Sequence, residues 1–202
     1  VFLFVGPAVS MRSLAEEFRQ GTFELLMTSP IRPAEIVLGK FLGLMAFMLI
    51  LLVPTLVFVI SLELHGRPDY GEVLSGYLGL LLVAAAMLSS GMFASSLTQS
   101  QLLAFVGTLA FWLVLVLVTA AMPLLAGLAE ANAAALDAHA SASGILEWLA
   151  GAARFIGHGN PAVRMTGFVN GLVDTFGIVY FITATAFFLL AAVVSINLRR
   201  EL

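Results

Sequence analysis

Four long stretches without any charged side chain dominate the pattern of apolar and polar positions along this chain. They are Phe41–Leu62, Val73–Thr98, Leu102–Ala129 and Thr175–Leu198. The hydrocarbon core of a bilayer is about 30 Å thick, and a helix crosses it with about 20 apolar residues. Each stretch is long enough to cross a membrane, so the pattern predicts an all-α fold, a polytopic transmembrane helical bundle.

The uncharged region from Val73 to Ala129 is too long for a single crossing. It holds 57 residues, which one helix would extend over ~86 Å. A polar quartet interrupts it and predicts a tight turn between two helices: Thr98, Gln99, Ser100 and Gln101. Pro54, inside the first stretch, is expected as a kink that a bundle tolerates. The predicted spans are residues 33–62, 73–98, 102–127 and 175–198.

Basic side chains predict how these spans are oriented. Six of the nine lie before the first uncharged stretch or just after the last: Arg12, Arg19, Arg32, Lys40, Arg199 and Arg200. Four crossings separate the two groups, so both lie on one side, which the positive-inside rule makes the cytoplasm. We therefore expect a multi-pass protein of the inner (cytoplasmic) membrane, with residues 11–32 in the cytoplasm and residues 128–174 outside. Residues 1–10 are interpreted as the end of a further transmembrane helix, so the chain is expected to be N-terminally truncated.

The predicted extracytoplasmic segment carries two apolar stripes at helical spacing. The first is Ile145, Trp148, Leu149, Ala152, Phe155 and Ile156, and the second is Met165, Phe168, Val169, Leu172, Val173 and Phe176. Both are too short to span and predict helices in the membrane interface. The alanine-rich stretch Ala129–Ala142 is expected as a weak helix or a linker. These helices either pack as an ordinary loop or close the outer exit, and the pattern leaves both open.

Composition narrows the possible functions. AVILMFWYC residues make up 61% of the chain and charged residues 10%, against about 25% charged in soluble proteins. There is no cysteine, and no G-x-x-x-x-G-K-[ST] or H-E-x-x-H motif, so we expect no thiolate metal site and no ATP site in this chain. Ser89, Ser90 and Gly91 with His158 form a weak case for a protease, and close helix packing explains the small residues better.

The segment from Met11 to Met27 is amphipathic. Its apolar stripe is Met11, Leu14, Phe18, Thr22 and Leu25, and its polar positions are Arg12, Glu16, Glu17, Arg19, Gln20 and Glu24. Gly21 predicts a bend, and Pro33 suits the first turn of the next helix. From the pattern alone, this segment either presents a docking surface or only anchors the bundle from the solvated side.

The run from Met11 to Gly43 resembles the cytoplasmic loop of ABC-2 type transporter permeases, in the branch with the gliding-motility-associated permeases. The matching positions are Glu16, Glu17, Arg19, Gly21, Thr22, Glu24, Leu25, Leu26, Thr28, Ser29, Pro30, Gly39 and Lys40. Weaker matches are Gly76–Leu81, Ser95–Thr98 and Gly171–Thr175, whereas Phe18 departs from the pattern. The resemblance covers nearly the whole chain. Residues 1–202 are therefore predicted to form one permease domain.

The resemblance implies a permease of the ABC-2 (type V exporter) kind, with residues 11–32 as a coupling helix. It implies a transport subunit that is not itself an enzyme, and a separate ABC ATPase that binds ATP and Mg. The implied coupling interface is Leu14, Glu16, Glu17, Phe18, Arg19, Gly21, Thr22, Glu24 and Leu25, with a second contact at Thr98, Gln99, Ser100 and Gln101.

Further partners implied are the lipid bilayer and a second permease, either another copy (a homodimer) or a paralogue. No nucleic acid, metal or cofactor is expected to bind this chain. An ion-coupled secondary transporter and a non-transporting scaffold stay as alternatives, although the four spans lack the ionisable residues that ion coupling uses.

Overall fold

The computed structural model describes residues 2–21, 32–66, 69–135 and 140–200, and within them the regular structure is helical throughout. In chain order the helices are α1 (Phe2–Ser10), α2 (Ala15–Gln20), α4 (Pro33–Leu52), the 3₁₀ turn η1 (Val53–Thr55), α5 (Leu56–His65), α6 (Tyr70–Leu97), α7 (Gln101–Ala135), α8 (Ala140–Gly157), α9 (Pro161–Val169) and α10 (Thr175–Arg200). The predicted all-α fold is confirmed.

Four helical segments of the described chain are long and apolar enough to cross a membrane. They are Pro33–His65, Tyr70–Leu97, Gln101–Asn132 and Thr175–Leu198. The first begins at Pro33, as predicted, and the Glu35 side chain accepts a hydrogen bond from the Arg32 backbone N–H at 3.2 Å. The interruption predicted at the polar quartet is present, because α6 ends at Leu97 and α7 begins at Gln101.

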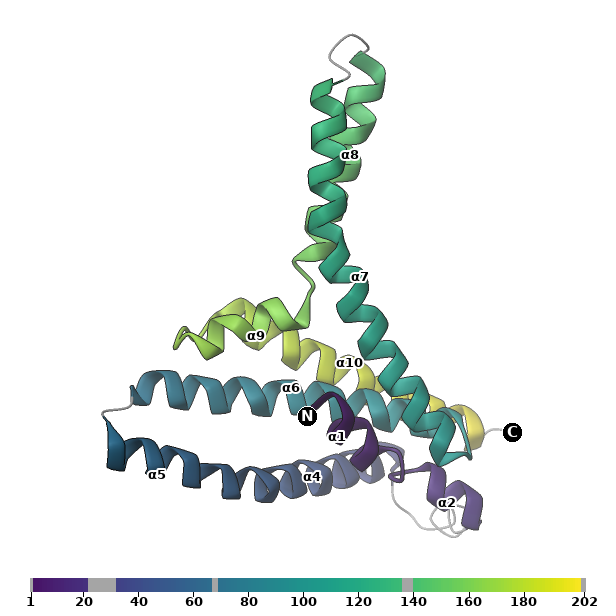
Figure 1. Ribbon diagram of the computed structural model, residues 1–202. Helices are drawn as coiled ribbons and strands as arrows, with labels where there is room; N and C mark the ends of the chain where they lie inside the picture. The colour runs from purple at the N-terminus through teal and green to yellow at the C-terminus, as the bar shows by residue number, and fades with distance from the viewer. Residues whose placement is uncertain (1, 22–31, 67–68, 136–139, 201–202) are drawn as a thin grey trace. The chain divides into compact units, whose positions relative to one another are not determined.

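The chain forms two compact units, one from Val1–Ala110 with Gly167–Leu202 and the other from Phe111–Thr166. In the first unit α6 is the central helix, and it packs against α1, α2, α4 and α10 (Figure 1). Its sequence allows this because many of its buried positions are serine, alanine or glycine. Small side chains let helix backbones approach closely where no water is present to drive association.

The closest approach in this unit is the crossing of α1 and α6. A Cβ added at Gly91 of α6 would lie 1.8 Å from the Oγ and 2.7 Å from the Cβ of Ser10 in α1. One turn away along α1, a Cβ added at Gly6 would lie 3.0 Å from the Met87 Cβ. The Ser10 hydroxyl is fully buried and donates to the Gly6 carbonyl at 2.8 Å. The crossing therefore depends on small residues in both helices.

The first span is broken near its middle by Pro54. The proline has no N–H to continue the helical ladder, and the turn η1 separates α4 from α5 there. Thr55 bridges the break, because its Oγ1 donates to the Leu52 carbonyl at 2.6 Å and lies 2.7 Å from the Tyr77 Oη of α6. Beyond the break none of the residues of α5 is buried.

We expect Tyr77→Phe to destabilise the protein only slightly. The substitution removes the hydrogen bond between α6 and the break in the first span and keeps the ring. Interhelical hydrogen bonds in membrane proteins contribute about 0.6 kcal/mol on average. Thermal unfolding in detergent measures the effect, and a loss of several kcal/mol would show that the hydroxyl also supports the α4–α5 break itself.

In the second unit α8 runs back alongside α7 (Figure 1). The seam uses small residues: Ala150 is fully buried, and a Cβ added at Gly157 would lie 3.3 Å from the Pro123 ring. Arg154 pairs with Glu130 at 3.2 Å. The large residues of the first predicted stripe face outward instead, with Trp148 70% exposed. Two helices that pair in water would instead bury their large apolar side chains in the seam between them.

One prediction about residues 128–174 is wrong. Helix α7 continues to Ala135, through the first part of the stretch that was expected as a weak helix or a linker, because alanine favours helix. The second stripe does not lie on one helix, since α9 ends at Val169 and the chain turns at Gly171 with a φ of 77° before α10 begins at Thr175. Leu172, Val173 and Phe176 therefore do not continue the face of α9.

Candidate functional site

The amphipathic segment predicted to carry function forms a short helix between two bends. We call residues 11–21 the elbow; it contains α2 and ends at Gly21, whose φ of 69° is left-handed. Glycine adopts this conformation without a Cβ penalty, and it commonly ends helices. The bend predicted at Gly21 is confirmed. Thr22, Glu24 and Leu25 of the predicted interface lie outside the described residues.

Ser95 of α6 fastens the start of α2. Its Oγ accepts hydrogen bonds from the backbone N–H groups of Leu14 and Ala15 at 3.1 and 2.8 Å, and it donates to the Met11 carbonyl at 3.1 Å. The first N–H groups of a helix lack partners within the helix, and a serine commonly supplies one. Here the serine comes from another helix, since Leu14 at the N-cap has no capping side chain.

An apolar cluster attaches the elbow to the helices of the bundle. Leu14 of the elbow is fully buried with Val37 of α4, Met92 of α6 and two residues of α10, Ala192 and Ile196. Phe18 is partly buried against this group, which we call the anchor cluster. Since Ile196 lies near the end of α10, the elbow and the C-terminal part of α10 occupy the same end of the bundle (Figure 1).

Lys40 of α4 ties the elbow to a second helix. Its Nζ lies 2.5 Å from the Glu17 Oε2 and donates to the Ser13 carbonyl. The side chains are 31% exposed for Glu17 and 21% for Lys40, but the paired Glu17 Oε2 atom is itself buried, so the contact between the two charges is shielded from water. Shielding makes charge-assisted hydrogen bonds stronger than those on an open surface. Lys40 therefore holds α2 against α4.

The opposite face of α2 is open and carries its own charge network. The Glu16 carboxylate accepts from Arg19 at 2.7 Å and from Gln20 at 2.6 Å. The hydrogen bond from Arg19 lowers the pKa of Glu16 below its usual value, so the carboxylate is ionised at neutral pH. Arg19 is 63% exposed. This face offers a positive and a negative group, held in fixed positions, to whatever approaches the elbow.

The structure thus divides the residues that the resemblance placed in one interface. Arg19 and Gly21 are exposed on the outer face and at the end of α2, and Glu16 is partly exposed beside Arg19. Leu14 and Phe18 pack into the anchor cluster, and Glu17 faces Lys40. Leu14, Phe18 and Glu17 therefore attach α2 to the bundle, and the predicted contact of this segment with a partner stays a prediction.

The polar quartet turns the chain at the same end of α6 as the elbow. The Ser100 N–H donates to the Thr98 Oγ1 at 3.1 Å, and the Ser100 carbonyl accepts from the Ala104 N–H at 3.1 Å as α7 begins. Ser95, which holds the elbow, lies three positions before Thr98. Gln99 is exposed at the tip of the turn. Elbow and turn are therefore close enough along α6 to face a common partner.

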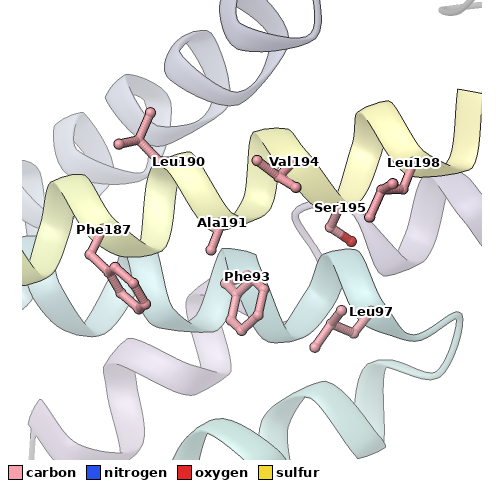
Figure 2. Close-up of a pocket in the computed structure, with 8 residues that line it drawn as sticks. All are labelled: Phe93, Leu97, Phe187, Leu190, Ala191, Val194, Ser195 and Leu198. Atoms are coloured by element: carbon pink, nitrogen blue, oxygen red, sulfur yellow. The ribbon is translucent and has the colours of Figure 1, made fainter.

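An open apolar groove of about 570 Å³ lies between α6 and α10 (Figure 2). It is lined by Phe93, Leu97, Phe187, Leu190, Ala191, Val194, Ser195 and Leu198. Ser195 contributes its one hydroxyl, which donates to the Ser96 carbonyl at 3.4 Å. Phe93 also packs against the anchor cluster. The groove is thus an apolar surface backed by the same helices that hold the elbow.

Sequence reasoning missed the two side chains that fasten the elbow, Ser95 and Lys40. Both belong to stretches that the resemblance had marked, but their partners are far away in the chain, with Ser95 eighty positions from Ala15 and Lys40 twenty-seven from Ser13. The available signal was a lysine directly before the uncharged stretch Phe41–Leu62, since a charge at the edge of such a stretch needs a partner.

A family model described as "ABC-2 family transporter protein" matches residues 1–198. The searches of curated proteins and of solved structures gave no match.

Proposed function

Because the chain belongs to the ABC-2 transporter family, and is thus a membrane permease of an ABC transporter, we propose that its elbow receives the movement of a separate ABC ATPase. ATP and Mg are bound by that partner, since the chain has no phosphate-binding G-x-x-x-x-G-K-[ST] motif. The direction is export across the inner membrane, and two permease subunits form the pathway.

One observation carries this proposal: α2 has one face held by the bundle and one face left open. Ser95 and Lys40 attach it to α6 and α4, and Leu14 is fully buried. On the other side Arg19 and Gln20 are exposed, and Glu16 is partly exposed beside them. A helix with no role beyond covering the surface would not need a hydrogen bond, an ion pair and apolar packing to three spans. A helix that transmits force needs both the attachment and a free docking face.

The lack of ionisable side chains in the four uncharged stretches also supports an external ATPase as the energy source. An ion-coupled transporter places ionisable side chains inside the bilayer to bind or relay the ion. The four uncharged stretches contain no such residue. The energy for a conformational change is then supplied at the water-exposed end, where the elbow and the turn at Gln99 lie.

Site-directed crosslinking tests the proposal. The 202 residues contain no cysteine, so a product can be assigned to the cysteine that is introduced. A cysteine replacing Gln20, on the open face of α2, is expected to crosslink in intact cells to a polypeptide that contains a P-loop motif. A cysteine replacing Leu64 of α5, which is 77% exposed, serves as the matched control and is expected to give no such product.

Reversal of charge at Arg19 should weaken the same contact. We expect Arg19→Glu to reduce the apparent affinity about tenfold, equivalent to ~1.4 kcal/mol, because a rim charge of the wrong sign opposes docking. If Gln20→Cys never reaches a nucleotide-hydrolysing protein while the assembly is intact, the elbow is not the coupling element.

A further inference from the structure

Serines near both ends of α6 complete the hydrogen bonding of other segments. At the end near the elbow, Ser95 supplies the missing cap of α2. At the far end, where α6 begins, Ser75 is 3% exposed and its Oγ donates to the Phe168 carbonyl of α9 at 2.7 Å. In both places a side chain of α6 bonds to backbone groups at the end of a short helix.

The hydrogen bond from Ser75 joins the hydrogen bonds that end α9. The Leu172 N–H bonds to the Gly167 carbonyl at 3.0 Å, and the Gly171 N–H bonds to the Phe168 carbonyl at 3.3 Å. With the left-handed φ of 77° at Gly171, this is a Schellman motif. A carbonyl has two lone pairs, so Ser75 occupies the second acceptor site of Phe168. Phe168 itself is fully buried.

A steric fit accompanies the hydrogen bond. A Cβ added at Gly171 would lie 3.0 Å from the Glu72 Cγ in the first turn of α6. At Gly171 the turn of residues 167–174 therefore lies directly against the first turn of α6. A movement of this end of α6 must carry the turn with it.

Between the two contacts α6 is an uninterrupted helix. Ser75 and Ser95 are twenty positions apart, about 30 Å along a helix axis, and no proline or 3₁₀ turn separates them. The first span, which Lys40 also ties to the elbow, is broken at Pro54. A movement of the elbow is thus passed along α6 intact, whereas the first span can bend at its break.

We propose that α6 is the connecting helix that carries movement of the elbow to the turn at residues 167–174, with Ser95 and Ser75 as the positioning residues at its two ends. This inference rests on the proposed function, because it takes the ATPase to move the elbow. The far turn is then the place where the ATPase cycle changes access on the opposite side of the membrane.

Two single-cysteine variants of the complex, purified through a tag on this chain, test this. One probe replaces Arg12 in the elbow and the other replaces Leu172 in the far turn, both exposed positions. A spin label on each reports mobility with and without ATP, Mg and vanadate. In the otherwise unchanged chain both labels are expected to respond. With Ser75→Ala, the label at Arg12 still responds and the response at Leu172 is lost.

Three further variants separate a positioning role from general packing. Ser75→Thr keeps the hydroxyl and is expected to retain the response at Leu172. Gly171→Ala strains the turn and crowds Glu72, so it is expected to lose the response without any change in α6. Ser89→Ala is the matched control, because Ser89 is fully buried in α6 but bonds only to Ala86 of its own helix. It is expected to leave both labels responsive.

The outcomes distinguish the two proposals. If the label at Arg12 does not respond in the unchanged chain, the elbow does not move with ATP and both proposals fail. If Arg12 responds but Leu172 responds equally well in Ser75→Ala and Gly171→Ala, α6 does not carry the movement and only this inference is overturned. An equal loss with Ser89→Ala also overturns it, since the effect is then one of packing.

Discussion

Gly91→Ala is expected to destabilise the bundle by about 1–3 kcal/mol, the usual range for an overpacked core. The new Cβ would lie 2.7 Å from the Cβ of Ser10. A rotation of the serine hydroxyl does not remove this clash, because a Cβ is fixed to its backbone. The two helices must separate, and the loss extends to the neighbouring contact between Gly6 and Met87. Gly91→Leu is expected to prevent correct packing altogether.

Thermal unfolding of the detergent-solubilised protein measures this effect. Gly76→Ala is the matched control on the same helix, since a Cβ there would meet nothing within 4 Å; it is expected to be neutral or slightly stabilising. Combining Gly91→Ala with Ser10→Gly restores the room, so the pair is expected to be less destabilised than the sum of its parts. Equal losses for Gly91→Ala and Gly76→Ala would show that α1 does not approach α6 this closely.

The spans could be predicted because membrane helices are read from length and polarity, which are local. The start at Pro33, the turn at Thr98 and the bend at Gly21 follow from the residues themselves. The end of α7 could not be predicted, since an alanine-rich stretch has no signal that stops a helix. The true end of α9 depended on Gly171, which the predicted stripe had passed over.

The attachment of the elbow could not be predicted from the sequence, for a different reason. An amphipathic pattern tells which residues share a face, but not which face the bundle covers. Leu14 and Phe18 were predicted in the coupling interface from the resemblance, and the pattern could not show that the anchor cluster holds both of them. Glu17 and Glu16 are adjacent and chemically alike, yet one pairs with Lys40 and the other with Arg19. Only the packing of α4 and α6 separates them.

The largest functional effect is predicted for the ion pair between Lys40 and Glu17. Lys40→Met is expected to loosen the elbow from α4, because it removes the ion pair with Glu17 and the hydrogen bond to the Ser13 carbonyl. Glu17 is left largely shielded with no counter-charge. Charge-assisted hydrogen bonds contribute ~1.5–3 kcal/mol, and since water reaches both side chains we expect a loss of about 1–2 kcal/mol. The ATPase would then move the elbow without moving α4.

Spin labels distinguish this uncoupling from simple loss of stability. One label replaces Arg12 in the elbow and a second replaces Leu42 of α4, which is 64% exposed. In Lys40→Met we expect the elbow to respond to ATP, Mg and vanadate while α4 no longer does. Gly91→Ala is the control for stability, because it is expected to lose a similar amount of stability without touching the pair of Lys40 and Glu17.

Exchange of the two charges provides the decisive comparison. The double variant Lys40→Glu with Glu17→Lys rebuilds the ion pair in reverse, so it is expected to recover much of the response of α4 that Lys40→Met loses. Recovery would assign the effect to the attachment of α2 to α4, because neither the native lysine nor the native carboxylate remains in place. If the exchange is as defective as Lys40→Met, the ion pair is not what links the elbow to the first span. If α4 responds normally in Lys40→Met, Ser95 and the anchor cluster hold the elbow without it.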